Sequence, residues 1–176
     1  VYDKHQNDEK IWVENIGPLF EQGTVTKFYN QYNLLVLEKT FLDNLKVHYK
    51  EYYEYSGKLS SEYTSYFTAD GSMTGKYMAY FENGKVQTIG QFYDGDFTNI
   101  KVGTWQYFNS DGTLNATEQH KVSIEKWGNG KLKIAGGYIY DADKAMWLKT
   151  GEWRPYTEDG IPQAVKKFQR GIEVTE

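Results

Sequence analysis

The chain has 176 residues, a length that suits one domain of ordinary size or a short repeat array. Its formal net charge is -4 and it has no basic stripe, which argues against nucleic-acid binding and against strong electrostatic binding to anionic lipid. Cysteine is absent, which excludes disulfides and thiolate metal sites, and no run approaches the roughly 20 apolar residues of a transmembrane helix.

The first 48 residues differ from the rest of the chain. Residues 1–10 (VYDKHQNDEK) are polar, as expected of a flexible N-terminal tether. Residues 11–48 contain the most apolar stretch, YNLLVLEKTF, and are predicted to form a β segment that caps a repeat array. The chain begins with Val rather than Met. We therefore expect a trimmed, extracytoplasmic protein, periplasmic or surface-anchored, with a cytoplasmic location as the alternative.

Residues 49–176 are rich in aromatic residues and in turn signals. Aromatic side chains suit half-buried strands, and glycine readily adopts the positive φ of a tight turn. Asn-Gly and Asp-Gly pairs, the strongest short-range hairpin signal, occur at six glycines. These are Gly71, Gly84, Gly95, Gly112, Gly130 and Gly160, with weaker signals at Gly23, Gly57 and Gly171. No segment has a convincing helical pattern, and residues 162–171 (PQAVKKFQRG) are predicted to contain a strand.

The segments between these turns form an internal repeat. In three copies an aromatic residue precedes the turn glycine by seven positions, and another glycine precedes the aromatic residue by two. The copies are Tyr77–Gly84, Trp105–Gly112 and Trp153–Gly160, with looser copies at Tyr49–Gly57 and Tyr63–Gly71 and a shortened copy at Trp127–Gly130. The steps between the aromatic residues from Tyr77 onward are 28, 22 and 26 residues, or roughly two strands and two turns.

We therefore predict an all-β protein, an antiparallel meander of repeated β-hairpins that forms one elongated sheet of about a dozen strands. Residues 49–176 would form the repeats, in one continuous domain with 11–48. A single hairpin is marginal in water, so the copies must stack on one another, and their aromatic side chains would pack between neighbouring units.

The motifs GKYMAYFENGKV, GTWQYFNSDGTL and TGEWRPYTEDGIP resemble the bacterial MORN-repeat variant. Its units read approximately as Gly, any residue, aromatic, two spacers, Tyr, a polar turn with Gly, any residue, Leu. The resemblance covers about residues 49–171 and is best over 75–115. It implies an all-β meander with a binding or interaction role, and some members of that family are described as antitoxins of toxin–antitoxin pairs.

Four aromatic residues recur at the repeat period and are candidates for a binding surface. They are Tyr77, Trp105, Trp127 and Trp153. Regular recurrence is what packing requires, so a structural role is the favoured interpretation. A stacking surface for sugars is the alternative, and single-strand nucleic-acid binding would also require a positive groove.

Other polar clusters have weaker claims. The pairs Asp94/Asp96 and Asp141/Asp143 supply too few oxygens for a calcium loop and are typical of turns. The three histidines, His5, His48 and His120, have no metal-ligand spacing. His120 lies near Glu118 and could pair with it, but polarity on a strand surface is the favoured interpretation. The sequence predicts no catalytic residue, cofactor or metal.

These observations favour a non-enzymatic protein-interaction or scaffold module that is exported or surface-anchored. The partner would be a protein, recognised through a broad sheet face or a sheet edge. An immunity or antitoxin protein that binds a cognate toxin is the alternative. A carbohydrate-binding surface protein is a second alternative, so a glycan partner stays open.

Overall fold

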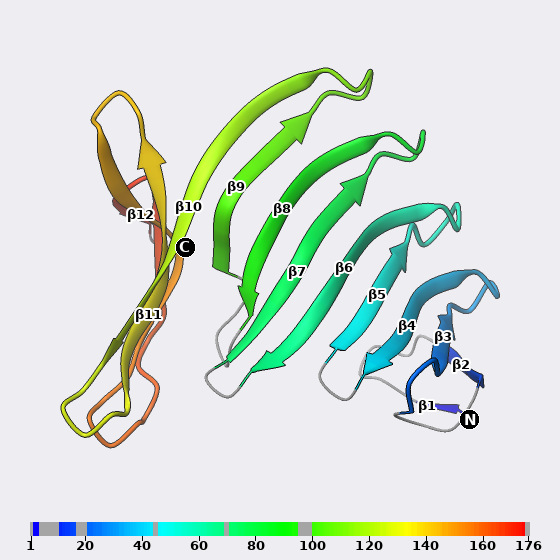
Figure 1. Cartoon of the computed structure of the whole chain (residues 1–176), viewed down its shortest axis with the longest axis horizontal. Coiled ribbons are helices and arrows are strands. Elements are labelled where there is room, and N and C mark those ends of the chain that lie inside the picture. Colours follow the sequence, from blue (N-terminus) through cyan, green and yellow to red (C-terminus); the bar gives the residue numbers. More distant parts are fainter. Residues whose placement is uncertain are drawn as a thin grey trace.

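The computed structural model describes residues 2–3, 11–16, 21–43, 46–68, 71–94 and 100–174. Within these residues the chain forms one 14-stranded antiparallel sheet, with the strands in chain order and no helix (Figure 1). The predicted all-β meander of hairpins is therefore confirmed. The strands are β1 (Tyr2–Asp3), β2 (Ile11–Ile16), β3 (Val25–Tyr29), β4 (Leu35–Asp43), β5 (Lys46–Tyr52), β6 (Leu59–Thr68), β7 (Gly71–Tyr80), β8 (Val86–Asp94), β9 (Ile100–Phe108), β10 (Leu114–Lys126), β11 (Leu132–Asp141), β12 (Met146–Pro155), β13 (Lys166–Gln169) and β14 (Ile172–Val174).

The N-terminal segment is part of the same sheet. Tyr2–Asp3, inside the predicted tether, pairs with Ile11–Trp12 of β2, whereas residues 4–10 lie outside the described residues. Strands β2 to β4 pair in succession, and β5 joins them to β6. The predicted cap at 11–48 thus continues into the repeats through ordinary strand pairing.

Five turns share one backbone structure. In each, the first amide donates to the fifth carbonyl, and the fourth amide donates to the first carbonyl; the turns are 30–34, 81–85, 109–113, 127–131 and 157–161. The fourth residue has a positive φ, which glycine adopts without strain. This confirms the predicted turns at Gly84, Gly112, Gly130 and Gly160. The predicted turns at Asp70-Gly71 and Asp94-Gly95 fall partly outside the described residues.

Neighbouring turns at the same ends of the strands are tied together by side chains. The sequence Asn-Gly-Lys at 83–85 donates two bonds to the next turn, from Asn83 Nδ2 to the Ser110 carbonyl at 2.9 Å and from Lys85 Nζ to the Asp111 carbonyl at 2.7 Å. The same sequence at 129–131 donates to the carbonyls of residues 158 and 159, both at 3.0 Å. Each of these two turns is therefore tied to the next turn at the same end of the strands.

The long strand β10 divides the sheet into two parts. Its first half, Leu114–His120, pairs with β9, and its second half, His120–Lys126, pairs with β11. Among its residues only His120 belongs to both registers, opposite Gly103 on one side and Ile139 on the other. The sheet bends along β10, and β11 and β12 turn away from the direction of β5–β9 (Figure 1).

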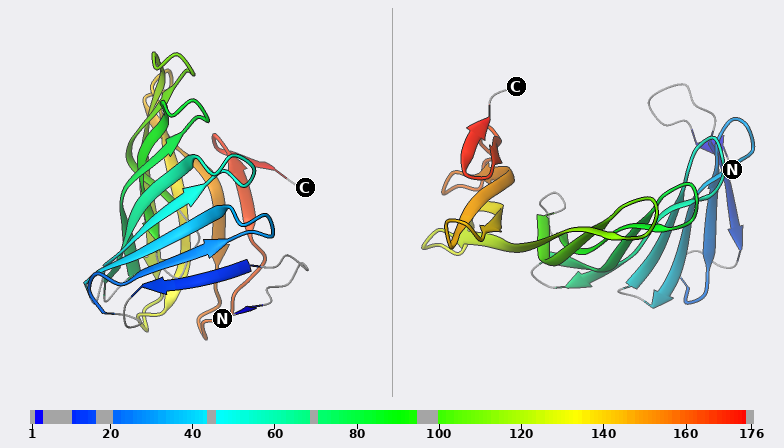
Figure 2. Two further views of the ribbon diagram at one scale, coloured as in Figure 1. Left: turned by 90° about the vertical axis from the view of Figure 1, so that its right-hand side faces the viewer. Right: turned by 90° about the horizontal axis from the view of Figure 1, so that it is seen from above.

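The bend brings β9 and β11 together across β10. A Cβ atom added to Gly137 in β11 would lie 3.0 Å from Cγ2 of Ile100 in β9. In a flat sheet, strands that are two positions apart lie about 9.5 Å from each other. Seen from above, the N-terminal strands and the C-terminal hairpin rise on the same side of the sheet (Figure 2). We call the region where β9, β10 and β11 meet the corner.

The repeat is inverted across the corner. The turns that follow Tyr77 and Trp105 close the hairpins β7–β8 and β9–β10, whereas the turns that follow Trp127 and Trp153 close β10–β11 and β12–β13. Strand β10 is therefore both the second strand of one hairpin and the first strand of the next. Because neighbouring strands run in opposite directions, the later turns lie at the opposite ends of the strands from the earlier turns.

The inversion also changes the face on which the tryptophans lie. Trp105 is the cross-strand partner of Glu118, so it shares a face with His120, which we call the His120 face. Trp153 packs on Tyr138, whose cross-strand partner is Lys121. Lys121 follows His120 in β10 and points to the other face. In the sequence, this inversion corresponds to the short step of 22 residues from Trp105 to Trp127, because the two copies share strand β10.

Candidate functional site

The two tryptophan hairpins are built alike from their first residues. Residues 101–105 (KVGTW) and 149–153 (KTGEW) both contain a central glycine with a φ of 68°, a value that L residues rarely adopt. In both, the lysine ammonium lies over the tryptophan, 4.6 Å from the ring centroid of Trp105 and 4.3 Å from that of Trp153. This is a cation–π contact. The shared unit is therefore Lys-x-Gly-x-Trp.

Each tryptophan lies on a glycine of the preceding strand. A Cβ atom at Gly90 would be 2.2 Å from the Trp105 ring, and one at Gly136 would be 2.2 Å from the Trp153 ring. Each indole Nε1 donates to the carbonyl of the residue after that glycine, at 3.1 Å and 3.2 Å. Trp105 is 2% exposed and Trp153 is 1% exposed. Both candidate binding aromatics are thus packing residues that present no ring face to a ligand.

The other two candidate aromatics are half-buried. Tyr77 belongs to a row with Tyr49, Tyr63 and Trp105, with centroid separations of 4.9, 6.2 and 5.8 Å along the row. The rings in this row are stacked or tilted by at most 37°, so they cover one another's faces. Trp127 donates its indole N–H to the Tyr156 carbonyl at 3.2 Å.

A third shared position lies fifteen residues after the aromatic residue of each main copy. The ring there meets the first ring edge to face, with interplanar angles of 74°, 74° and 75°. The pairs are Tyr77–Phe92, Trp105–His120 and Trp153–Phe168. His120 therefore occupies a position that phenylalanine fills in the other two copies.

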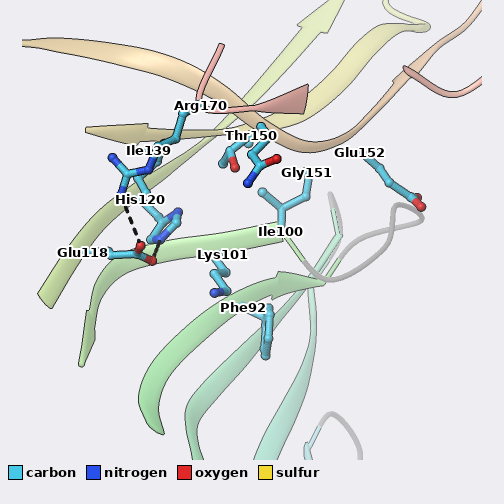
Figure 3. Close-up of a pocket in the computed structure, with 12 residues that line it drawn as sticks. Phe92, Ile100, Lys101, Glu118, His120, Ile139, Thr150, Gly151, Glu152 and Arg170 are labelled. Atoms are coloured by element: carbon cyan, nitrogen blue, oxygen red, sulfur yellow. Dashed lines mark hydrogen bonds and ion pairs between the residues drawn. The ribbon is translucent and has the colours of Figure 1, made fainter. Parts of the chain in front are cut away.

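A cavity of about 550 Å³ lies in the corner next to this histidine. Its walls come from β8 to β13 and from the turn between β13 and β14 (Figure 3). The lining residues are Phe92, Ile100, Lys101, Glu118, His120, Gly137, Ile139, Thr150, Gly151, Glu152, Gln169 and Arg170. The cavity thus joins apolar walls to a small group of charged side chains, the usual composition of a small-molecule site.

Glu118 is the centre of that charged group. Its Oε2 accepts hydrogen bonds from the Tyr107 hydroxyl at 2.8 Å and from His120 Nε2 at 3.0 Å. Arg170 reaches back from the β13–β14 turn, and its guanidinium lies 3.6 Å from Glu118 Oε1 (Figure 3). Lys101 donates to the Tyr107 hydroxyl at 2.6 Å. The C-terminal hairpin is therefore tied to β10, and three elements meet at one carboxylate.

Burial and hydrogen bonding together set the protonation states of this group. Burial lowers the pKa of His120 and of Lys101. Burial alone would raise the pKa of Glu118, but hydrogen bonds from His120 and Tyr107 outweigh it and hold that pKa below its ordinary value. At neutral pH Glu118 is therefore ionised and His120 neutral. An ionised carboxylate only accepts, so His120 carries its proton on Nε2 and leaves a bare lone pair on Nδ1.

His120 corrects one interpretation of the sequence. Polarity on a strand surface was the favoured account, but the side chain is 4% exposed and its pairing with Glu118 is formed. Its Nδ1 is buried, and no group of the described residues forms a hydrogen bond with it. The available signal was the spacing that aligns His120 with Phe92 and Phe168, because the ring at that position packs edge to face on the aromatic residue of its copy.

The remaining polar candidates have local roles or lie outside the described residues. Asp141 accepts a hydrogen bond from the Lys144 amide at 3.1 Å, which agrees with the turn interpretation. His48 lies 3.1 Å from the Thr64 hydroxyl and 3.6 Å from Glu62. His5 and Asp96 lie outside the described residues. Within the described part of the chain, no group of three potential metal-ligating side chains occurs, and no helix could cross a membrane.

Comparisons with known proteins add little to this geometry. No family model and no curated protein matches the chain. Among solved structures, the crystal structure of TarM is similar over 78% of this chain, with 8% sequence identity and a TM-score of 0.38. The match spans 21% of the TarM chain.

Proposed function

We propose that this chain is a non-enzymatic protein-interaction module that binds its partner on the His120 face of the N-terminal strands. The observation that carries the proposal is the aromatic row at Tyr49, Tyr63 and Tyr77. The rings are half-buried, and in the described part of the chain the sheet is a single layer. A partner protein that supplied a second layer would bury the rest of these rings, and aromatic residues are enriched at such interfaces.

The burial pattern supports a face that contributes both packing and binding. Val47, Ser61 and Ala79 are buried, at 6%, 4% and 8% exposure, and each lies two residues from a tyrosine of the row, on the same face of its strand. Buried smaller side chains thus lie beside the half-buried rings on this face. A rigid aromatic surface loses little conformational entropy when a partner binds, which favours affinity.

The stacking of the row favours a protein over a glycan as the partner. Sugars bind aromatic side chains by lying on an exposed ring face, as nucleic-acid bases do. In the row the ring faces lie against one another, with Tyr49 and Tyr63 only 11° from parallel. The resemblance to the MORN-repeat variant agrees with an interaction role. A toxin would be one such partner, and export to the cell surface stays part of the proposal.

Site-specific photo-crosslinking in the cells that make the protein tests this proposal. A crosslinking amino acid replaces Tyr63 in one variant and Lys50 in a matched control. Lys50 belongs to the neighbouring strand β5, where it faces away from Tyr49 and lies 3.5 Å from Glu38. We expect one protein to be crosslinked from position 63 and not from position 50. Equal crosslinking from both positions, or none from position 63, would contradict the proposal.

A further inference from the structure

In the three main copies of the repeat, His120 stands at a position that phenylalanine occupies in the other two. Phe92 and Phe168 hold the equivalent position with nearly the same ring geometry, so an aromatic ring satisfies the fold there. Histidine at this position adds two polar atoms. Glu118 accepts from one, while Nδ1 is buried and has no hydrogen-bond partner in the described part of the chain. Leaving a buried acceptor unpaired costs free energy, and a ligand that donates a hydrogen bond would recover it.

The same comparison distinguishes the lysine of this copy. Lys101 and Lys149 occupy the first position of the shared Lys-x-Gly-x-Trp unit and lie over their tryptophans alike. Only Lys101 lines the cavity. Burial lowers its pKa, and it forms no ion pair with a carboxylate among the described residues. An anion in the cavity would therefore gain a partly desolvated cation that is already held in place.

Arg170 adds a second cation from the opposite wall. It occupies the β13–β14 turn with a φ of 45°, a conformation that asparagine or glycine adopts more readily than arginine. Its contact with Glu118 is 3.6 Å, and a guanidinium has five N–H donors, so donors remain for a ligand. The cavity carboxylates are already paired, Glu118 as described and Glu152 with Arg154 at 3.0 Å. Among the charged side chains of the cavity, Lys101 and Arg170 therefore keep donors for a ligand, and His120 keeps one acceptor.

We propose that the corner cavity binds a small hydroxylated carboxylate of sugar-acid type. The carboxylate would lie between Lys101 and Arg170, and a hydroxyl would donate to His120 Nδ1. Phe92, Ile100 and Ile139 supply the apolar walls against which the carbon skeleton packs. The cavity adjoins the aromatic row, because Phe92 packs edge to face on Tyr77, but its occupant and its test are independent of the protein-binding proposal.

Isothermal calorimetry with glucuronate as the probe tests the site. Glucose carries the hydroxyls without the carboxylate, and acetate carries the carboxylate alone. We expect glucuronate to bind more tightly than either, and Lys101→Ala to weaken it at least tenfold. Lys149→Ala is the matched control because it removes the equivalent lysine outside the cavity, and it should leave binding unchanged. Equal binding of glucose and glucuronate, no binding of glucuronate, or equal loss in both lysine variants would overturn the proposal.

His120→Phe tests the acceptor separately. The variant copies the residue present at positions 92 and 168, so we expect it to fold. It should weaken glucuronate binding severalfold and leave acetate binding unchanged. In the wild-type protein, glucuronate should also shift the ¹⁵N resonance of His120 Nδ1, because a hydrogen bond forms at that atom. An unshifted resonance, or full glucuronate affinity in His120→Phe, would contradict the assigned hydroxyl contact.

The ligand could be a free sugar acid or one residue of an acidic polysaccharide. Tetragalacturonate compared with galacturonate distinguishes these sources, since both present the same carboxylate and hydroxyl chemistry. Tighter binding of the tetramer that is lost in Lys101→Ala would support the site and identify a chain as the source. Monomer binding that is equally tight, and equally lost in the variant, would support it with a free acid. Tetramer binding that persists unchanged in Lys101→Ala would overturn it.

Discussion

The hairpins of Trp105 and Trp153 contain the same parts but lie in different surroundings. Each has a lysine over the indole, a glycine with a φ of 68° and a tryptophan buried on a glycine of the preceding strand. Yet the two tryptophans lie on opposite faces of the sheet, and the turns that follow them lie at opposite ends of the strands. Local sequence therefore determines the hairpin, whereas the number of strands between copies determines its orientation.

The two hairpins also differ in the ring that packs on the tryptophan. The ring that meets Trp153 is Phe168, and the ring that meets Trp105 is His120. His120 lies where β10 passes from one part of the sheet to the other, beside the corner cavity. The same packing position has thus acquired a polar side chain where the inversion creates a concave space.

Truncation of either tryptophan should have the largest effect on this comparison. Trp105→Ala and Trp153→Ala each remove a fully buried indole, and we expect each to lower the free energy of unfolding by about 3–5 kcal/mol. Urea denaturation followed by circular dichroism measures both. Losses that differ by more than a factor of about two would mean that the two hairpins are not equivalent.

Filling the glycine beneath each tryptophan should come next. Gly90→Ala and Gly136→Ala place a methyl group 2.2 Å from a ring atom, and such overpacking costs about 1–3 kcal/mol or more. Gly128→Ala is the control, because a Cβ atom there meets nothing within 4 Å. If the control destabilised the protein as much as Gly136→Ala, the indole–glycine contact would not be the cause.

Removing the turn contacts should have a smaller effect, and an equal one on both sides of the corner. Asn83→Ala and Asn129→Ala each delete a bond to the next turn and an acceptor within their own turn. We expect a loss of about 0.5–1.5 kcal/mol each. Hydrogen exchange of the Gly112 and Gly160 amides should rise in the respective variant only. A rise at both amides in either variant would show that the two turn ladders are not independent.

The corner should also make stability depend on pH. Burial lowers the pKa of His120 below 6.5, so at a given pH the unfolded chain binds a proton at this residue more readily than the folded chain does. The stability that comes from this neutral, buried histidine is fully present above pH 6.5 and is lost as the pH falls toward the pKa of His120 in the folded state. The contribution of Glu118 is lost at lower pH, because its pKa in the folded state lies below the ordinary value of 4.5. Thermal unfolding of His120→Phe should lack the first loss, and a profile unchanged from wild type would contradict this assignment.

Much of the architecture could be predicted from the turn glycines and the aromatic spacing, because both act locally. The turn at Asn33 was missed, since it uses asparagine rather than glycine at a φ of 62°. The face on which each tryptophan lies, and the strand end at which its turn lies, could not be predicted from local sequence, because both depend on the number of strands between the copies. The step of 22 residues was the visible signal of the single shared strand. The site required the alignment of His120 with Phe92 and Phe168, since a histidine on a polar strand otherwise indicates a surface.

The close approach of β9 and β11 is the most direct consequence of the corner. In ¹H NOE spectra of the isotope-labelled protein, the Cγ2 methyl of Ile100 should show a cross-peak to the Hα protons of Gly137, since a Cβ at Gly137 would lie 3.0 Å from that methyl carbon. In a sheet that continued flat through β10, the two strands would lie about 9.5 Å apart and this cross-peak would be absent. Its presence is the predicted result, and its absence in a fully assigned spectrum would contradict the bend at the corner and the cavity that the bend forms.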